Sequence, residues 1–122
     1  QSQGKGEAWY VNPKDSRRYF LNRPEDATQV MRKLGVGITN KNLAKIPRGE
    51  TKDKVGSQAV VDKLRGRIVI QVQSKGEAWY ISPVDGKRYY MGRPEDALKL
   101  IRKLGMGISN TNLNKISIGL TQ

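Results

Sequence analysis

Alternating hydrophobic and polar positions predict three strands in the second half of the chain. In residues 67–73 (RIVIQVQ) the aliphatic side chains of Ile68, Ile70 and Val72 share one face, which is typical of a strand. Residues 77–82 and 88–91 continue the two-residue period. Between them, the segment SPVDGK supplies proline, aspartate and glycine where a tight turn needs them. The pattern therefore predicts a hairpin preceded by one further strand.

A helical period follows the hairpin. Pro94 suits the first position of a helix, and two acids follow it, at the positive end of the helix dipole. Apolar residues then recur at helical spacing, and Gly105 suits the C-cap (Ala97, Leu100, Ile101, Leu104). Ser109 or Asn110 suits the cap of a short second helix.

The same pattern occurs seventy residues earlier in the chain. Lys5–Ile46 and Lys75–Ile116 align without a gap and share 26 of 42 residues, which indicates a duplication. We therefore expect an α+β tandem duplication, in which each repeat is a small antiparallel β-sheet, a hairpin plus one strand, packed on two short helices. The predicted organisation is a first repeat at 1–46, a connector at 47–66, a second repeat at 67–116 and a C-terminal tail at 117–122. In the connector, Ser57–Leu64 is predicted to form a short capped helix.

The two repeats differ in ways that affect the fold. The first repeat has no counterpart of residues 68–70, so we expect it to lack its first strand and to leave a sheet edge open. In the hairpin turn, Ser16 stands where the second repeat has Gly86. A positive φ at this serine would cost on the order of 1 kcal/mol.

The C-terminal segment offers a replacement for the missing strand. Ile116, Ile118 and Leu120 alternate as the aliphatic residues of the strand at 67–73 do. The segment is predicted to be a donated strand that completes the sheet of a first repeat, in its own chain or in the next one. Donation to the next chain would give an oligomer or a filament. An ordinary tail explains the same alternation.

Composition narrows the classes of function. The chain has 23 basic and 11 acidic residues, a net charge of +12, which favours anionic partners such as nucleic acid, an acidic wall polymer or anionic lipid. A basic surface that serves only solubility gives the same charge. The chain has no cysteine and no histidine, so we expect no disulfide and no transition-metal site. No apolar run is long enough for a membrane span, and no signal-peptide pattern is present.

The acidic residues do not indicate catalysis. Glu25-Asp26 and Glu95-Asp96 stand in the first turns of predicted helices, where acids are favoured by the dipole. Asp15 and Asp85 are turn residues of the kind that bond their own backbone. Because no histidine can activate a serine or threonine, we expect neither an enzyme nor a cofactor.

Two glycine segments resemble helix-hairpin-helix DNA-binding motifs. They are Leu34–Ile38 (LGVGI) and Leu104–Ile108 (LGMGI), each predicted to lie between two helices. The resemblance implies that glycine amides hold a DNA phosphate and that nearby lysines contribute (Gly35, Gly37, Gly105, Gly107, Lys41, Lys45, Lys115). The chain runs about two residues longer than the family pattern after the second glycine. A C-cap glycine followed by a tight turn between helices explains the same letters.

Aromatic and basic residues are interleaved on the predicted hairpins. We expect Tyr19 with Arg17, and Tyr89 with Arg88, to form an aromatic and basic surface that could stack sugars or single-stranded bases. The alternative is that the tryptophan and one tyrosine of each repeat belong to the core.

The phrase GEAWYxxPxDGKRYYxGRP resembles tandem repeats of predicted exported or surface proteins of bacteria. The resemblance implies an extracellular or cell-surface location and a non-enzymatic role. The predicted function is that of a structural or interaction repeat protein that self-assembles by strand donation into a homo-oligomer or polymer. The alternative is sequence-independent nucleic-acid binding through the Gly-x-Gly segments and the basic surface.

Overall fold

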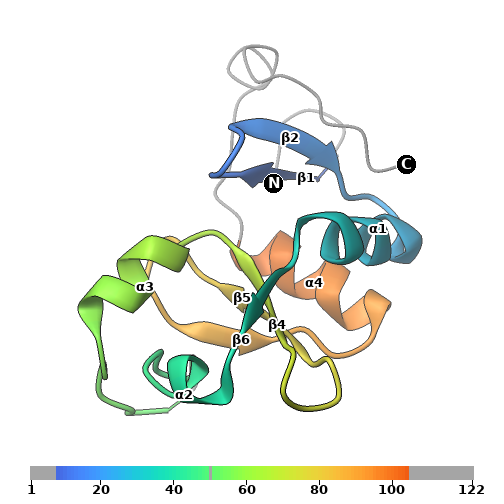
Figure 1. Cartoon of the computed structure of the whole chain (residues 1–122). Coiled ribbons are helices and arrows are strands. Elements are labelled where there is room, and N and C mark those ends of the chain that lie inside the picture. Colours follow the sequence, from blue (N-terminus) through green and yellow to red (C-terminus); the bar gives the residue numbers. More distant parts are fainter. Residues whose placement is uncertain (1–7, 50, 105–122) are drawn as a thin grey trace. The chain divides into compact units, whose positions relative to one another are not determined.

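The computed structural model describes residues 8–49 and 51–104, and it has an α+β architecture (Figure 1). The chain divides into two compact units: unit 1 consists of residues 1–33 and 93–122, and unit 2 of Leu34–Gly92. These boundaries fall inside the sequence repeats. The elements are β1 (Trp9–Asn12), β2 (Arg17–Phe20), α1 (Pro24–Leu34), β3 (Val36–Ile38), α2 (Asn40–Leu43), α3 (Gln58–Leu64), β4 (Ile68–Gln71), β5 (Ala78–Ile81), β6 (Arg88–Tyr90) and α4 (Pro94–Leu104).

Unit 2 contains a four-stranded sheet in the order β3-β4-β5-β6. The strands β4, β5 and β6 are antiparallel, as predicted, but β3 lies parallel to β4, with Val36 opposite Val69 and Ile38 opposite Gln71. The sheet is therefore mixed, and the expectation of a purely antiparallel sheet was wrong. The reason is that Val36–Ile38, expected as a turn between helices, is β-branched and alternating, and Ile38 is buried as a strand residue.

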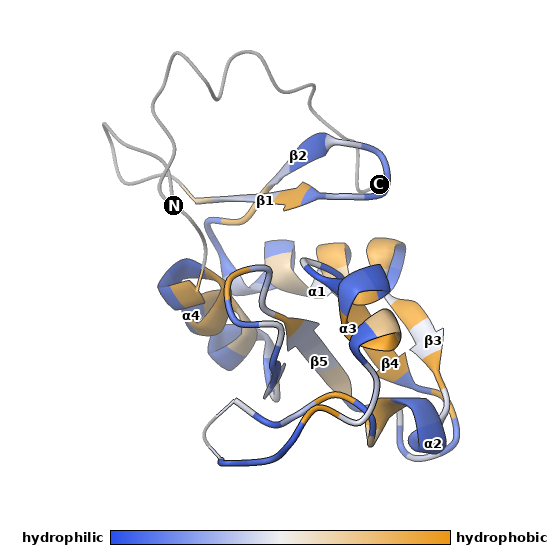
Figure 2. Ribbon diagram, turned by 90° about the vertical axis from the view of Figure 1, so that its left-hand side faces the viewer, coloured by the Kyte–Doolittle hydropathy of each residue, from blue (hydrophilic) through white to orange (hydrophobic). Residues whose placement is uncertain are grey.

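The core of unit 2 lies between this sheet and the helices α2 and α3. Thr39 caps α2, because its hydroxyl accepts from the Asn42 amide at 3.1 Å, and Ser57 caps α3 in the same way. The connector helix was therefore predicted correctly. Apolar side chains of the helices and of one sheet face form a single cluster, consistent with the apolar colouring of β3 and β4 in Figure 2 (Ile38, Leu43, Ile46, Val61, Val69, Ile81).

Unit 1 contains the hairpin β1–β2 and the helices α1 and α4. The inward side chains of the hairpin, Tyr10 and Tyr19, are each 3% exposed. The start of α1 is capped by Asp26, whose carboxylate accepts from the backbone amides of Asn22 at 3.1 Å and Arg23 at 2.9 Å. This confirms the structural role predicted for that acid. Arg102 of α4 donates to the side-chain oxygen of Asn22 at 2.7 Å, which ties α4 to the loop before α1.

The two hairpin turns have the same backbone conformation. Ser16 has a φ of 58° and Gly86 a φ of 70°, so the serine keeps the left-handed conformation expected of it. The turns are also anchored alike, since Asn12 and Ser82 are both buried and their side chains accept from the amides of Lys14 and Val84. The strain at Ser16 is therefore present, as predicted.

Candidate functional site

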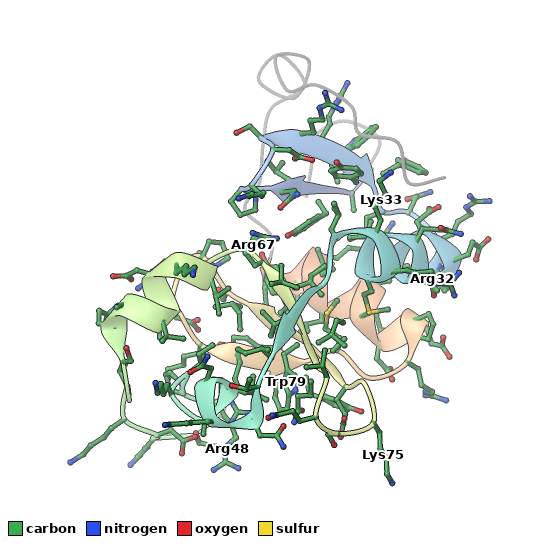
Figure 3. All side chains as sticks on the ribbon, in the orientation of Figure 1. Arg32, Lys33, Arg48, Arg67, Lys75 and Trp79 are labelled. Atoms are coloured by element: carbon green, nitrogen blue, oxygen red, sulfur yellow. The ribbon has the colours of Figure 1, made fainter. Side chains whose placement is uncertain are left out.

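Each hairpin carries the same stack of an arginine, a tryptophan and a second aromatic ring. In β1–β2 the Trp9 and Phe20 rings lie 5.2 Å apart, and the guanidinium of Arg18 lies 4.4 Å from the Trp9 ring. In β5–β6 the Trp79 and Tyr90 rings are also 5.2 Å apart, with Arg88 at 4.5 Å from Trp79. Aromatic and cation–π contacts stabilise both stacks. Figure 3 shows Trp79 on the sheet of unit 2.

The turn aspartates are held by the tyrosines of the same hairpins. The hydroxyls of Tyr19 and Tyr89 donate to the carboxylates of Asp15 and Asp85. The hydrogen bond to Asp15 raises the pKa of Tyr19. Burial raises the pKa of Asp15, but the hydrogen bonds from Tyr19 and from a backbone amide outweigh it, so the net pKa lies below the usual range. The same carboxylates accept from the backbone amides of Arg17 and Lys87, each at 2.9 Å, which is the backbone bonding predicted for these aspartates.

The exposed aromatic residues are not the ones that the sequence indicated. Tyr19 was expected at the surface but is 3% exposed, whereas its neighbour Phe20 is 36% exposed. In unit 2, Tyr89 is half-buried and Tyr90 is 57% exposed. The prediction for Tyr19 was wrong because Tyr19 pairs with Tyr10 on the buried face of the hairpin. The register places Phe20 opposite Trp9, a signal that the alternation of buried and exposed positions carries.

The basic residues of that predicted surface also differ from each other. Arg17 is exposed, but Arg88 is half-buried and its Nε donates to the carbonyl of Ile46 at 2.8 Å. This arginine therefore holds the segment that follows α2 against the hairpin.

In unit 2, both edges of the hairpin β5–β6 have neighbours. On the β6 side, the Arg88 amide donates to the carbonyl of Pro47 at 2.8 Å, and the Gly49 amide donates to the carbonyl of Arg88 at 2.9 Å. The segment Pro47–Gly49 thus lies alongside β6 like a short additional strand.

The β5 side of this hairpin is covered by β4. The Ile81 amide donates to the carbonyl of Arg67 at 3.0 Å, and the indole Nε1 of Trp79 donates to Oε1 of Gln71 at 2.6 Å. Ile81 itself is 0% exposed under the core cluster.

The matching groups of β1–β2 have no such neighbours among the residues that the structure describes. Nε1 of Trp9 and Nε of Arg18 are buried and have no hydrogen-bond partner. Val11, which matches Ile81, is 40% exposed. A buried donor without an acceptor costs about 1–3 kcal/mol, so native structures nearly always pair such groups. We call Trp9, Val11, Arg18 and Phe20 the hairpin surface and take it as the candidate site.

The glycine segment of the first repeat does not form a helical hairpin. Gly35 lies between α1 and β3, and Gly37 lies within β3, where its backbone is opposite Ile70. The geometry of the helix-hairpin-helix family is therefore absent at this segment. Lys41 is exposed in α2, and Lys45 is half-buried beyond it. The remaining predicted site residues lie outside the described part of the chain (Gly105, Gly107, Lys115, Ile116, Ile118, Leu120).

In the described part of the chain, the basic partner of the ion pairs is arginine rather than lysine. Each ion pair found in residues 8–49 and 51–104 uses an arginine, and the pair between Arg48 and Asp53 has an N–O distance of 2.9 Å. This arginine lowers the pKa of the Asp53 carboxyl well below its usual range. The lysines stand apart from these pairs, and Lys75 extends from a loop of unit 2 (Figure 3).

In the described part of the chain, no group of three or more acidic residues is placed to hold a metal ion. The helices in that part are too short or too polar to cross a membrane.

No protein-family model, curated protein or solved structure was found to match this chain.

Proposed function

We propose that this chain is a non-catalytic structural or interaction protein that assembles by exchanging sheet segments. The observation that carries the proposal is the origin of β3: it belongs to the first sequence repeat but pairs with β4 of the second, Val36 opposite Val69. A sheet built in this way depends on a segment from another repeat, and strand addition is a recurrent mode of protein association.

The donated segment in this proposal is Ile116–Gln122, with Ile116, Ile118 and Leu120 as its apolar side chains. Its support comes from the matching segment seventy residues earlier, where the first repeat ends and the connector begins: the carbonyl of Ile46 accepts from Arg88, and Pro47–Gly49 lie alongside β6. The corresponding position in unit 1 is the outer edge of β2, beside the Arg18 Nε that lacks an acceptor in the described residues. It differs from the place of the missing strand, beside β1, that the alternation alone predicted for this segment. Donation to another copy gives a homo-oligomer or a polymer.

A non-enzymatic role at the cell surface or outside the cell fits the observed use of the acids. Asp15, Asp85 and Asp26 accept hydrogen bonds from turns and from the start of a helix. Their carboxylates are therefore engaged in structure. The location rests on the resemblance of the GEAWYxxPxDGKRYYxGRP phrase to repeats of exported bacterial proteins.

Light scattering over a dilution series tests the proposal on the full chain and on a chain ending at Lys115. We expect assemblies that grow with concentration for the full chain, and a monomer for the shortened chain. Ile118→Asp should act like the truncation, whereas Val84→Asp, at a 69% exposed turn position, should leave assembly unchanged. A full chain that stays monomeric at all concentrations would contradict the proposal.

A second candidate, binding of an anionic polymer such as nucleic acid, rests on the lysines that stand outside the ion pairs described above. Without a helical hairpin at Gly35 and Gly37, the binding energy would come from the positive surface alone. Fluorescence anisotropy with labelled DNA should then show affinity that falls steeply between 50 and 200 mM salt, as expected for phosphate contacts (about 10³-fold or more for six contacts). Lys41→Ala and Lys115→Ala should weaken binding, and Asn42→Ala should not. Binding that is independent of salt would exclude this candidate.

A further inference from the structure

The neighbour of β5 in unit 2 has a simple chemical pattern. The residues of β4 are three aliphatic side chains followed by a glutamine (IVIQ), and they run antiparallel to β5 with Ile68 opposite Tyr80 and Ile70 opposite Ala78. The glutamine is the acceptor for the indole of Trp79. The strand thus supplies both apolar contact and the polar partner that the buried indole requires.

The backbone of β1 presents the same edge. The carbonyl of Ala8 accepts from the Leu21 amide at 2.9 Å, just as the carbonyl of Ala78 accepts from Met91 at 2.9 Å. Alternate residues of an antiparallel strand bond to opposite sides. Trp9 and Val11 therefore direct their amides and carbonyls away from β2, and no described strand pairs with them.

The sequence of β1 lacks the features that usually protect an open edge. Natural edge strands carry lysine, proline, inward charges or bulges that prevent pairing with another strand. The four residues of β1, WYVN, include no charge and no proline, and the ladder to β2 is regular. Such an edge is suited to pairing with another strand.

The indole of Trp9 is a second, independent observation. Its Nε1 is buried without an acceptor in the described residues, whereas the matching Nε1 of Trp79 donates to Gln71 at 2.6 Å. The hydrogen bond that β4 provides in unit 2 is therefore the one that Trp9 lacks.

We propose that the outer edge of β1 is a binding site for an extended segment with the pattern of β4, three aliphatic residues followed by a glutamine, running antiparallel to β1. The aliphatic residues pair with Tyr10, Trp9 and Ala8, and the glutamine accepts from the Trp9 indole. The site rests on the proposed function and deepens it, because it names an acceptor edge on the opposite side of the hairpin from the one considered for Ile116–Gln122.

The test uses a labelled peptide with the sequence of residues 67–73 (RIVIQVQ) and the full chain. Fluorescence anisotropy should show saturable binding. Val11→Pro removes an amide that points to the open edge and leaves the ladder to β2 intact, so it should weaken binding about tenfold or more. Val55→Thr, a change between β-branched side chains at a 48% exposed position outside the hairpin, should bind the peptide like the unchanged protein.

A double-mutant cycle tests the glutamine and the indole together. A peptide with leucine in place of the glutamine at position 71 should bind about fivefold more weakly, the effect of one lost hydrogen bond. In Trp9→Phe this difference between the peptides should disappear. The cycle keeps the proposal testable if Val11→Pro fails to fold.

Hydrogen exchange gives an independent readout at the edge. The amides of Trp9 and Val11 should exchange rapidly in the free chain and slow down when the peptide is added. Absence of binding at any peptide concentration, or slow exchange of both amides in the free chain, would overturn the proposal. Self-association is measured separately: a chain that assembles but does not bind the peptide refutes this site alone, and a monomer that binds the peptide refutes assembly alone.

Discussion

The hairpins β1–β2 and β5–β6 have similar sequences and the same internal contacts, but they differ in their neighbours. In both, an arginine covers a tryptophan and a tyrosine binds the turn aspartate. The second hairpin has β4 on one edge, Pro47–Gly49 on the other and α2 and α3 over one face, whereas the described residues supply none of these to the first. Local sequence therefore specifies the hairpin, and distant segments decide which of its surfaces are buried.

The largest expected contrast is between Ile81→Ala and Val11→Ala. Ile81 is 0% exposed in the core cluster, so its truncation should lower the free energy of unfolding by about 2–5 kcal/mol. Val11 is 40% exposed, and its truncation should cost about 0.5 kcal/mol. Urea denaturation followed by circular dichroism measures both. Equal losses of stability would mean that Val11 is as deeply buried as Ile81.

Alkaline pH should weaken unit 2 through Tyr80 of β5. Burial raises the pKa of this residue to about 12, so the folded state favours the neutral phenol. Its contribution is fully present below pH ~10, the pKa of an unfolded tyrosine, and it is lost as the pH rises towards 12. The loss should reach about 2–3 kcal/mol, from a shift of about two pKa units.

Denaturation curves between pH 8 and 11.5 check this effect. Tyr80→Phe serves as the control, since it cannot ionise and should show a smaller decrease in stability over the same range. Identical pH profiles for the two proteins would assign the alkaline destabilisation to other groups.

Gly49→Ala should test the contact along β6. A Cβ at position 49 would overlap the ring of Tyr89, so the segment Pro47–Gly49 or the ring has to move. We expect a loss of about 1–3 kcal/mol in the free energy of unfolding. The loss should be relieved in a Tyr89→Ser background.

Gly119→Ala is the matched substitution in the C-terminal tail, seventy residues after Gly49. A similar loss in the free energy of unfolding would indicate that residues around Gly119 contact the edge of β2 as Pro47–Gly49 contact the edge of β6. An unchanged stability for Gly49→Ala itself would contradict the close approach to Tyr89.

Ser16→Gly should have the smallest effect and should make the turns more alike. Ser16 has a φ of 58°, which glycine adopts without strain, so the substitution should stabilise the chain by about 1 kcal/mol or less. In the other turn, Gly86→Ala should be unfavourable, because the added Cβ would lie 2.8 Å from Val61 Cγ1. Thermal unfolding measures both, and a destabilised Ser16→Gly would refute the strain.

Much of the secondary structure could be predicted because it depends on local signals. The strand at Ile68–Gln71, the start of a helix at Pro94 and the capped helix after Ser57 all follow from alternation, a first-turn proline and a capping hydroxyl. These signals act between residues that are close in the chain, so a single sequence contains them.

The assignment of Val36–Ile38 failed because its partner is distant in the sequence. Gly35 and Gly37 are as typical of the end of a helix as of a strand. Only the pairing with β4, some thirty residues later in the chain, makes this segment a strand. The same limit applied to Tyr19. The alternation in RRYF shows that Tyr19 and Phe20 lie on opposite faces of the hairpin, but which of the two faces is buried depends on what packs against it.

The discontinuity of unit 1 also orders events during synthesis on the ribosome. Unit 2 is one continuous stretch and can fold once Gly92 has emerged, whereas unit 1 needs residues on both sides of it. The hairpin β1–β2 is therefore translated before unit 2. Unit 1, however, is complete only after the chain beyond Gly92 has also been translated. Until then the loop before α1 lacks its hydrogen bond from Arg102 of α4, so the incomplete unit 1 is open to contact with other newly made chains.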